Sequence, residues 1–120
     1  MGNLMKRVLI VNDKETTRRI INLALGQIPN VVVIGEANNG WDAVDFVEAD
    51  QPDVVVMDFR MPCMDGLEAT ERITKSWPKV KVIMHSMTGV SSQAGKAVGA
   101  YTVLRPYDSM KMLQTAVLNA

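Results

Sequence analysis

Residues 54–66 have the sequence VVVMDFRMPCMDG, in which a continuous apolar run of strand length ends at Asp58. A run that is apolar at every position, and mostly β-branched, is typical of a strand covered on both faces in a parallel sheet. Similar runs occur at residues 8–11, 31–34 and 80–84, with a weaker one at 101–104. The sequence therefore predicts five short, mostly buried strands.

Helical patterns lie between these runs. Apolar residues recur with helical spacing over 20–28, after Gly40 and after Gly66, and again over 110–117, where Asp108 or Ser109 is the predicted N-cap. The segment 89–99 contains three glycines and predicts only a short or mobile helix. Five strand–helix repeats with right-handed crossovers predict a flavodoxin-like (βα)5 fold, a doubly wound parallel α/β sheet of strand order 2-1-3-4-5.

The chain has 120 residues, which predicts one domain over residues 1–120. Its 13 basic residues equal its 13 acidic ones, so it lacks the broad basic surface of proteins that bind nucleic acid or membranes directly. A single cysteine, Cys63, cannot form an intrachain disulfide, and no signal peptide is visible, so we expect a cytoplasmic protein. Whether residues 1–5 are disordered or an added extension stays open.

Acidic residues follow two of the predicted strands. In the order 2-1-3-4-5, ligand sites form beyond the carboxyl ends of the first and third strands, where the strand order reverses. The first strand is followed by Asn12 and Asp13 and the third by Asp58. Two carboxylates brought together repel unless a cation lies between them, and oxygen ligands suit Mg²⁺. The sequence predicts a divalent-cation site at this edge.

The segment 54–66 resembles the phosphoacceptor region of response-regulator receiver domains, including its Met61-Pro62 and Asp65-Gly66 pairs. The resemblance extends over residues 6–118. It implies that Asp58 accepts a phosphoryl group from a sensor histidine kinase or phosphotransfer protein in two-component signal transduction. It also implies no enzyme activity beyond Mg²⁺-dependent self-phosphorylation and slow autodephosphorylation.

The resemblance also implies roles for residues around Asp58. Asp13 and Asp58 would bind Mg²⁺ together with the backbone carbonyl of Arg60, and Asn12 would contribute weakly or through water.

Further residues would act on the phosphoryl group. Ser86 and Arg105 would contact it, and Ser86 with Tyr101 would switch an output surface near the fourth helix and fifth strand. Counting back from Arg105, however, puts Thr102 at the aromatic position. A downstream output domain or a second copy of the chain would be the further partner.

Two departures from the family pattern keep an alternative open. Asn12 stands where the family usually has an acidic residue, and Arg105 where it has lysine. A degenerate receiver that acts as a phosphorylation-independent interaction module is therefore the second hypothesis. A flavodoxin-like protein that binds FMN is the third, and the absence of a glycine-rich loop over residues 12–15 argues against it.

Overall fold

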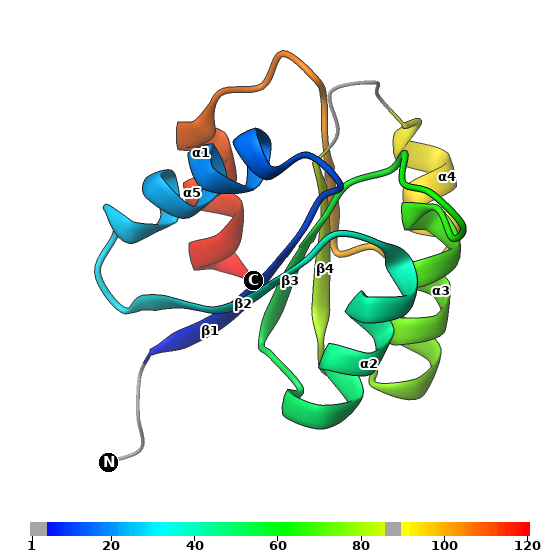
Figure 1. Cartoon of the computed structure of the whole chain (residues 1–120). Coiled ribbons are helices and arrows are strands. Elements are labelled where there is room, and N and C mark those ends of the chain that lie inside the picture. The colour runs from blue at the N-terminus through cyan, green and yellow to red at the C-terminus, as the bar shows by residue number, and fades with distance from the viewer. Residues whose placement is uncertain (1–4, 86–89) are drawn as a thin grey trace.

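The protein is described by a computed structural model covering residues 5–85 and 90–120. Its centre is one five-stranded parallel sheet of order β2-β1-β3-β4-β5, which confirms the predicted topology (Figure 1). The strands are β1 (Lys6–Val11), β2 (Val31–Ala37), β3 (Val54–Met57), β4 (Lys81–His85) and β5 (Thr102–Leu104).

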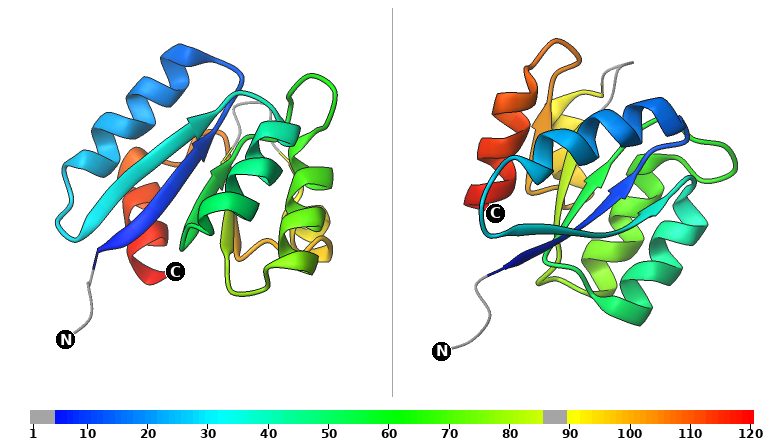
Figure 2. Two further views of the ribbon diagram at one scale, coloured as in Figure 1. Left: turned by 60° about the horizontal axis from the view of Figure 1, so that its bottom comes forward. Right: turned by 60° about the vertical axis from the view of Figure 1, so that its left-hand side comes forward.

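Helices cover both faces of the sheet. They are α1 (Glu15–Gly26), α2 (Gly40–Asp50), α3 (Gly66–Ser76), α4 (Ser92–Ala97) and α5 (Met110–Asn119). Helices α1 and α5 pack on one face, and α2, α3 and α4 lie on the other (Figure 2). Within the described residues, no helix has the length and apolar character needed to cross a bilayer.

Strand β3 shows why the apolar runs predict this layering. All four of its residues are buried. Val55 and Met57 belong to the core beneath α2 and α3, whereas Val54 and Val56 belong to the core beneath α1 and α5. Successive side chains of a strand point to opposite faces, so a strand covered on both faces needs an apolar residue at every position.

The helix starts follow the sequence signals closely. The side chains of Asn39, Asp65, Ser91 and Ser109 each accept a hydrogen bond from the backbone N–H three residues later, as N-cap residues do. Ser109, and not Asp108, is therefore the cap of α5. The helical spacing over 20–28 predicts that Ile20, Ile21 and Leu25 are all covered. Ile21 and Leu25 are buried, but Ile20 is half exposed, so the prediction was wrong for Ile20.

Helix α4 is short, as the glycines predict. Gly95 is buried where a Cβ atom would collide with the side chain of Val103 on β5, so glycine lets the helix lie close to the sheet. Gly99 follows with φ 96°, a left-handed conformation that glycine adopts without strain. Beside it, the Thr74 hydroxyl donates to the carbonyl of Val98 at 2.8 Å, which ties the end of α4 to α3.

Candidate functional site

The carboxyl ends of β1 and β3 place the predicted site residues side by side. Val11 pairs with Met57 in the parallel ladder. The N–H of Asp58 donates to the Val11 carbonyl at 2.9 Å, which carries the pairing one residue beyond the strand. Asn12 and Asp58 are therefore neighbours, and both are buried. The parallel ladder thus brings Asn12 and Asp58 to the same edge of the sheet, while the expected shared cation site of Asp13 and Asp58 stays a prediction.

Asp13 lies at the more open side of this edge. Its carboxylate is 3.8 Å from the Lys14 ammonium, and its side chain is partly exposed. It lines a hollow of about 430 Å³ together with Asn38, Asn39, Trp41, Pro62 and Cys63. The hollow joins the loops that follow β1, β2 and β3, so it gives solvent access beside the Asp58 edge. Helix α1 has Lys14 at its N-cap position, which excludes Asp13 as that cap.

The loop after β3 restrains both the carboxylate and the backbone of Asp58. One carboxylate oxygen, Oδ1, accepts a hydrogen bond from the Phe59 N–H at 2.9 Å. The N–H of Gly66 donates to the Phe59 carbonyl at 2.7 Å and closes the loop. A Cβ atom on Gly66 would overlap the Asp58 carbonyl oxygen, so the start of α3 can lie this close only because residue 66 is glycine. The Asp65-Gly66 pair is thus a structural support for Asp58.

The donor set at this edge consists of oxygen atoms. Asp13 and Asp58 offer carboxylates, Asn12 an amide oxygen, and Arg60 a backbone carbonyl on the loop after β3. The Asn12 Oδ1 atom already accepts from the Lys14 N–H at 2.9 Å. In the described part of the chain, no three His, Cys, Asp or Glu residues lie close enough to hold a metal together. The set fits a hard cation such as Mg²⁺, with less charge than three carboxylates would supply.

Arg105 is held by its own loop. Its side chain is 63% exposed and its guanidinium lies 3.1 Å from the Asp108 carboxylate, whose side chain is only 6% exposed. Asp108 also accepts the Arg105 backbone N–H at 2.7 Å, and this hydrogen bond, more than any other cause, holds the pKa of Asp108 below its usual value. The guanidinium lies 5.0 Å from the centre of the Tyr107 ring. Arg105 therefore has local partners, which sequence reasoning did not anticipate.

His85 is a buried polar residue at the same edge. It ends β4, and the β3–β4 register, in which Met57 pairs with Met84, puts it level with Asp58. The residue is 3% exposed, and Nδ1 has no hydrogen-bond partner among the residues described. Burial lowers the pKa of His85, and the Asp108 carboxylate opposes that shift. The sequence placed it correctly in a strand, but only the fold shows its proximity to Asp108.

The two predicted switch residues have different outcomes. Ser86 lies outside the described residues. Tyr101 immediately precedes β5, and its N–H donates to the carbonyl of Val82 near the start of β4 at 2.8 Å. Its hydroxyl donates to the Asn119 carbonyl at 3.0 Å. Tyr101 is therefore at the amino-terminal edge of the sheet, whereas Asp58 is at the carboxyl-terminal edge.

This fold, with a buried aspartate after β3 beside an Asn–Asp pair after β1, is the architecture of a receiver domain. The family model of the response regulator receiver domain matches residues 8–116. The chain belongs to this family.

Named relatives agree with that assignment. A protein-glutamate methylesterase/protein-glutamine glutaminase of Myxococcus xanthus is 36% identical over 108 residues, which are 88% of this chain and 31% of the relative. The response regulator UvrY of Escherichia coli is 46% identical over 80 residues, which are 67% of this chain and 37% of UvrY. The chain thus spans about a third of the length of these curated relatives.

A solved structure confirms the fold. The receiver domain of the response regulator NarL from Mycobacterium tuberculosis superposes with a TM-score of 0.88 at 27% identity, covering 96% of this chain and 94% of that one. In this family the receiver domain is not itself catalytic, and Mg²⁺ binding at the acidic edge is a general property.

Proposed function

We propose that this chain is a signalling switch in which Asp58 accepts a phosphoryl group from a cytoplasmic histidine kinase or phosphotransfer protein. The observation that carries the proposal is the placement of Asp58, buried and held at the carboxyl end of β3 beside Asn12. Family membership supplies the chemistry to which this geometry is suited. We also place the protein in the cytoplasm, where ATP-dependent kinases form phosphohistidine.

The transfer is a substitution at phosphorus. A carboxylate oxygen of Asp58 attacks the phosphorus of phosphohistidine, a P–O bond forms, the P–N bond breaks, and the imidazole leaves with the bonding electron pair. Because a carboxylate is a weak nucleophile, most of the rate comes from alignment and neutralisation of charge. The hydrogen bond from the Phe59 N–H fixes one oxygen of Asp58 and so orients the carboxylate.

Mg²⁺ bound at this edge would neutralise charge on the phosphoryl group during transfer. Asp13, Asp58 and the carbonyl of Arg60 would hold it, with Asn12 assisting weakly or through water. Replacing a third carboxylate by the Asn12 amide lowers the charge of the site, so we expect weak Mg²⁺ affinity. The proposed labelling is therefore tested over a range of Mg²⁺ concentrations.

Two further residues would respond to the new phosphate. Arg105 would supply a second cation, which requires its guanidinium to leave Asp108. Ser86 would donate its hydroxyl to a phosphoryl oxygen. Movement of these residues would alter the surface formed by α4 and β5, with Tyr101 beside it, and this surface would act on an output domain or a second copy.

Phosphodonor labelling tests the assignment. Purified protein is treated with phosphoramidate or acetyl phosphate, with and without Mg²⁺, and its intact mass is measured. We expect a gain of one phosphoryl group that needs Mg²⁺ and is lost in Asp58→Asn. The matched control, Asp45→Asn on the exposed face of α2, keeps the label. Labelling that persists in a folded Asp58→Asn variant contradicts the site.

A degenerate receiver is the second candidate, and the Arg105–Asp108 contact together with Asn12 favours it. In that case the folded protein takes no label at any Mg²⁺ concentration, and its affinity for a partner is the same with and without phosphodonor. Donor-dependent labelling of Asp58 eliminates this candidate. A purified protein without flavin absorbance likewise eliminates the FMN-binding alternative.

A further inference from the structure

The charges of this neutral chain are strongly separated along the sequence. Residues 20–59 contain seven acidic residues and no lysine or arginine, whereas residues 72–107 contain six lysines and arginines and no acidic residue. The first segment includes α2, and the second runs from the second half of α3 through α4 and β5 into the loop before α5. The acidic residues of α2 and the lysines after α3 therefore lie on different parts of the surface, although Arg72 of α3 lies over Trp41 of α2.

The negative charges concentrate on α2. We call Asp42, Asp45, Glu48 and Asp50 the acidic surface, and all four are exposed. The Asp42 carboxylate accepts a hydrogen bond from the Asn39 amide at 3.0 Å. In the described part of the structure none of the four carboxylates forms an ion pair, although α2 packs directly against α3.

Lysines of the second segment lie at a groove at the other side of α3, whereas Arg72 lies over Trp41 of α2 and Arg105 is paired with Asp108. This basic groove has a volume of about 420 Å³ and is formed by the end of α3, the α3–β4 loop, the end of α4 and Tyr101. Lys75 and Lys81 line it, and the exposed Lys79 lies between them in sequence. Glu71 also lines the groove, and its carboxylate lies 3.9 Å from the Lys75 ammonium. The Lys81 ammonium lies 5.9 Å from the centre of the Tyr101 ring.

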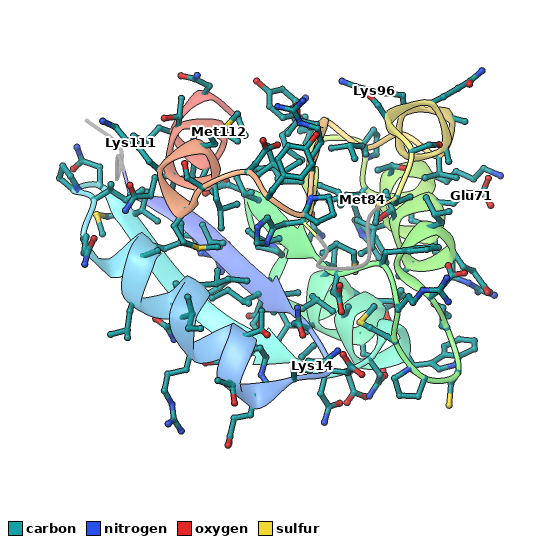
Figure 3. The ribbon with its side chains drawn as sticks, turned by 90° about the horizontal axis from the view of Figure 1, so that it is seen from above. Lys14, Glu71, Met84, Lys96, Lys111 and Met112 are labelled. Atoms are coloured by element: carbon teal, nitrogen blue, oxygen red, sulfur yellow. The ribbon has the colours of Figure 1, made fainter. Side chains whose placement is uncertain are left out.

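The groove lies at the amino-terminal edge of the sheet. Lys81 begins β4, whereas Asp58 follows the carboxyl end of β3. Figure 3 shows Glu71 and Lys96 on the α3–α4 side of the molecule, while Lys111 and Met112 of α5 lie on the opposite side. The basic groove is therefore separate from the site around Asp58.

We propose that the basic groove of one copy of this chain binds the acidic surface of a second copy. The two surfaces carry opposite charge. Among the described residues, the carboxylates of the acidic surface form no ion pair, and of the groove lysines only Lys75 has an ionic partner, Glu71. Because they lie on either side of α3, a neighbouring copy can present its acidic surface to the groove while its own groove stays open. Such a head-to-tail contact uses two different patches and continues from copy to copy instead of closing into a dimer.

The structure favours a protein surface over a nucleic acid as the occupant. A long polyanion that follows the lysines toward α3 would approach the carboxylates of α2 and be repelled by them. The chain also has no net positive charge with which to hold a nucleic acid. The two lysines of the groove also lack the planar, bidentate geometry with which arginine binds phosphate. The α2 helix of a second copy, in contrast, brings only its four exposed carboxylates to the groove.

Sedimentation equilibrium of the full chain tests the association. Exposed charges act over a Debye length of about 30 Å at 0.01 M ionic strength and about 3 Å at 1 M. At about 0.01 M we expect a weight-average mass above the monomer value of 13.2 kDa that rises with concentration and does not level off at the dimer. At about 1 M the mass returns to that of the monomer. A monomer at both ionic strengths overturns the proposal.

Charge reversal identifies the two surfaces. The variant Lys75→Glu/Lys79→Glu makes the groove acidic, and Asp45→Lys/Glu48→Lys makes α2 basic, so each variant alone stays monomeric. Mixed in equal amounts, the two variants carry complementary surfaces again and associate. Association of either variant alone, or no association of the mixture, contradicts the pairing.

Two controls complete the design. Arg19→Glu/Lys111→Glu changes the net charge as much as the groove variant does, but on α1 and α5, and it associates like the wild type. Lys75→Gln/Lys79→Gln removes the groove charges without placing a carboxylate beside Glu71, and it weakens association if charge pairing is the cause. Asp58→Asn associates normally, which separates this contact from the proposed phosphorylation. Circular dichroism confirms that each variant is folded.

Discussion

His85 makes the stability of this protein depend on pH near neutrality. It is the only histidine in the chain and is buried at the end of β4. Burial disfavours the imidazolium and lowers the pKa of His85 below 6.5, while the nearby Asp108 carboxylate partly opposes this shift. The folded protein therefore binds a proton at His85 less readily than the unfolded chain does.

The sign and size of the effect follow from proton linkage. Above the unfolded pKa both states hold neutral His85, and the stabilisation is complete. As the pH falls below 6.5, the unfolded chain takes up a proton that the folded protein excludes, so the free energy of unfolding decreases until the folded pKa is reached. One proton sets a limiting slope of about 1.4 kcal/mol per pH unit. Between about pH 7.5 and about pH 5.5 the loss is at most about 1.4 kcal/mol.

The pKa of Asp108 is lowered mainly by the hydrogen bond from the Arg105 backbone N–H. A lowered carboxylate pKa stabilises the fold above the unfolded value of 3.8, and this contribution is lost only as the pH falls from there through the folded pKa. The two pH windows are therefore separate. A loss of stability near pH 6 can be assigned to His85.

Urea unfolding at a series of pH values measures this loss. We expect the wild-type free energy of unfolding to fall between about pH 7 and about pH 5.5, and the His85→Gln variant to show a flat profile there. The variant is allowed to be less stable at every pH, because only the slope is compared. A wild type without a slope, or a variant with the same slope, refutes the assignment to a buried neutral imidazole.

Three further perturbations probe the core and the site. Thr70→Val removes a fully buried hydroxyl without a hydrogen-bond partner among the described residues, and we expect urea unfolding to show about 1 kcal/mol of added stability. Gly66→Ala forces a Cβ atom against the Asp58 carbonyl, so we expect a loss of about 1–3 kcal/mol in the same assay and reduced phosphodonor labelling. Asp108→Asn releases the Arg105 guanidinium, and we expect a larger labelled fraction by intact mass; unchanged labelling contradicts a role for Arg105.

Much of the candidate site follows from positions along the chain. Asp58 and Asn12 each directly follow an apolar strand, and parallel strands end at the same edge of a sheet. Strand order then makes them neighbours, so their proximity could be predicted without coordinates. The resemblance of 54–66 to a known family added the chemical role of Asp58.

The sequence was less informative about side-chain directions. A contact between Arg105 and the phosphoryl group stays a prediction, and the sequence did not indicate that its guanidinium lies against Asp108. Long cationic side chains have many rotamers, and nearby partners select among them, so their direction depends on the loop around them. Tyr101 was the candidate switch aromatic, and whether it is one remains a prediction. Its position at the amino-terminal edge depends on where β5 begins.

The apolar and polar pattern by itself determined the layered parallel sheet, because burial on both faces requires an apolar residue at each strand position. It also determined which residues follow the strands. Only the tertiary structure decided which side of α1 is covered, and it leaves Ile20 half exposed. It also decided that His85 is buried close to Asp108. These features arise from packing between segments distant in sequence, and a local pattern does not contain the surroundings that such packing creates.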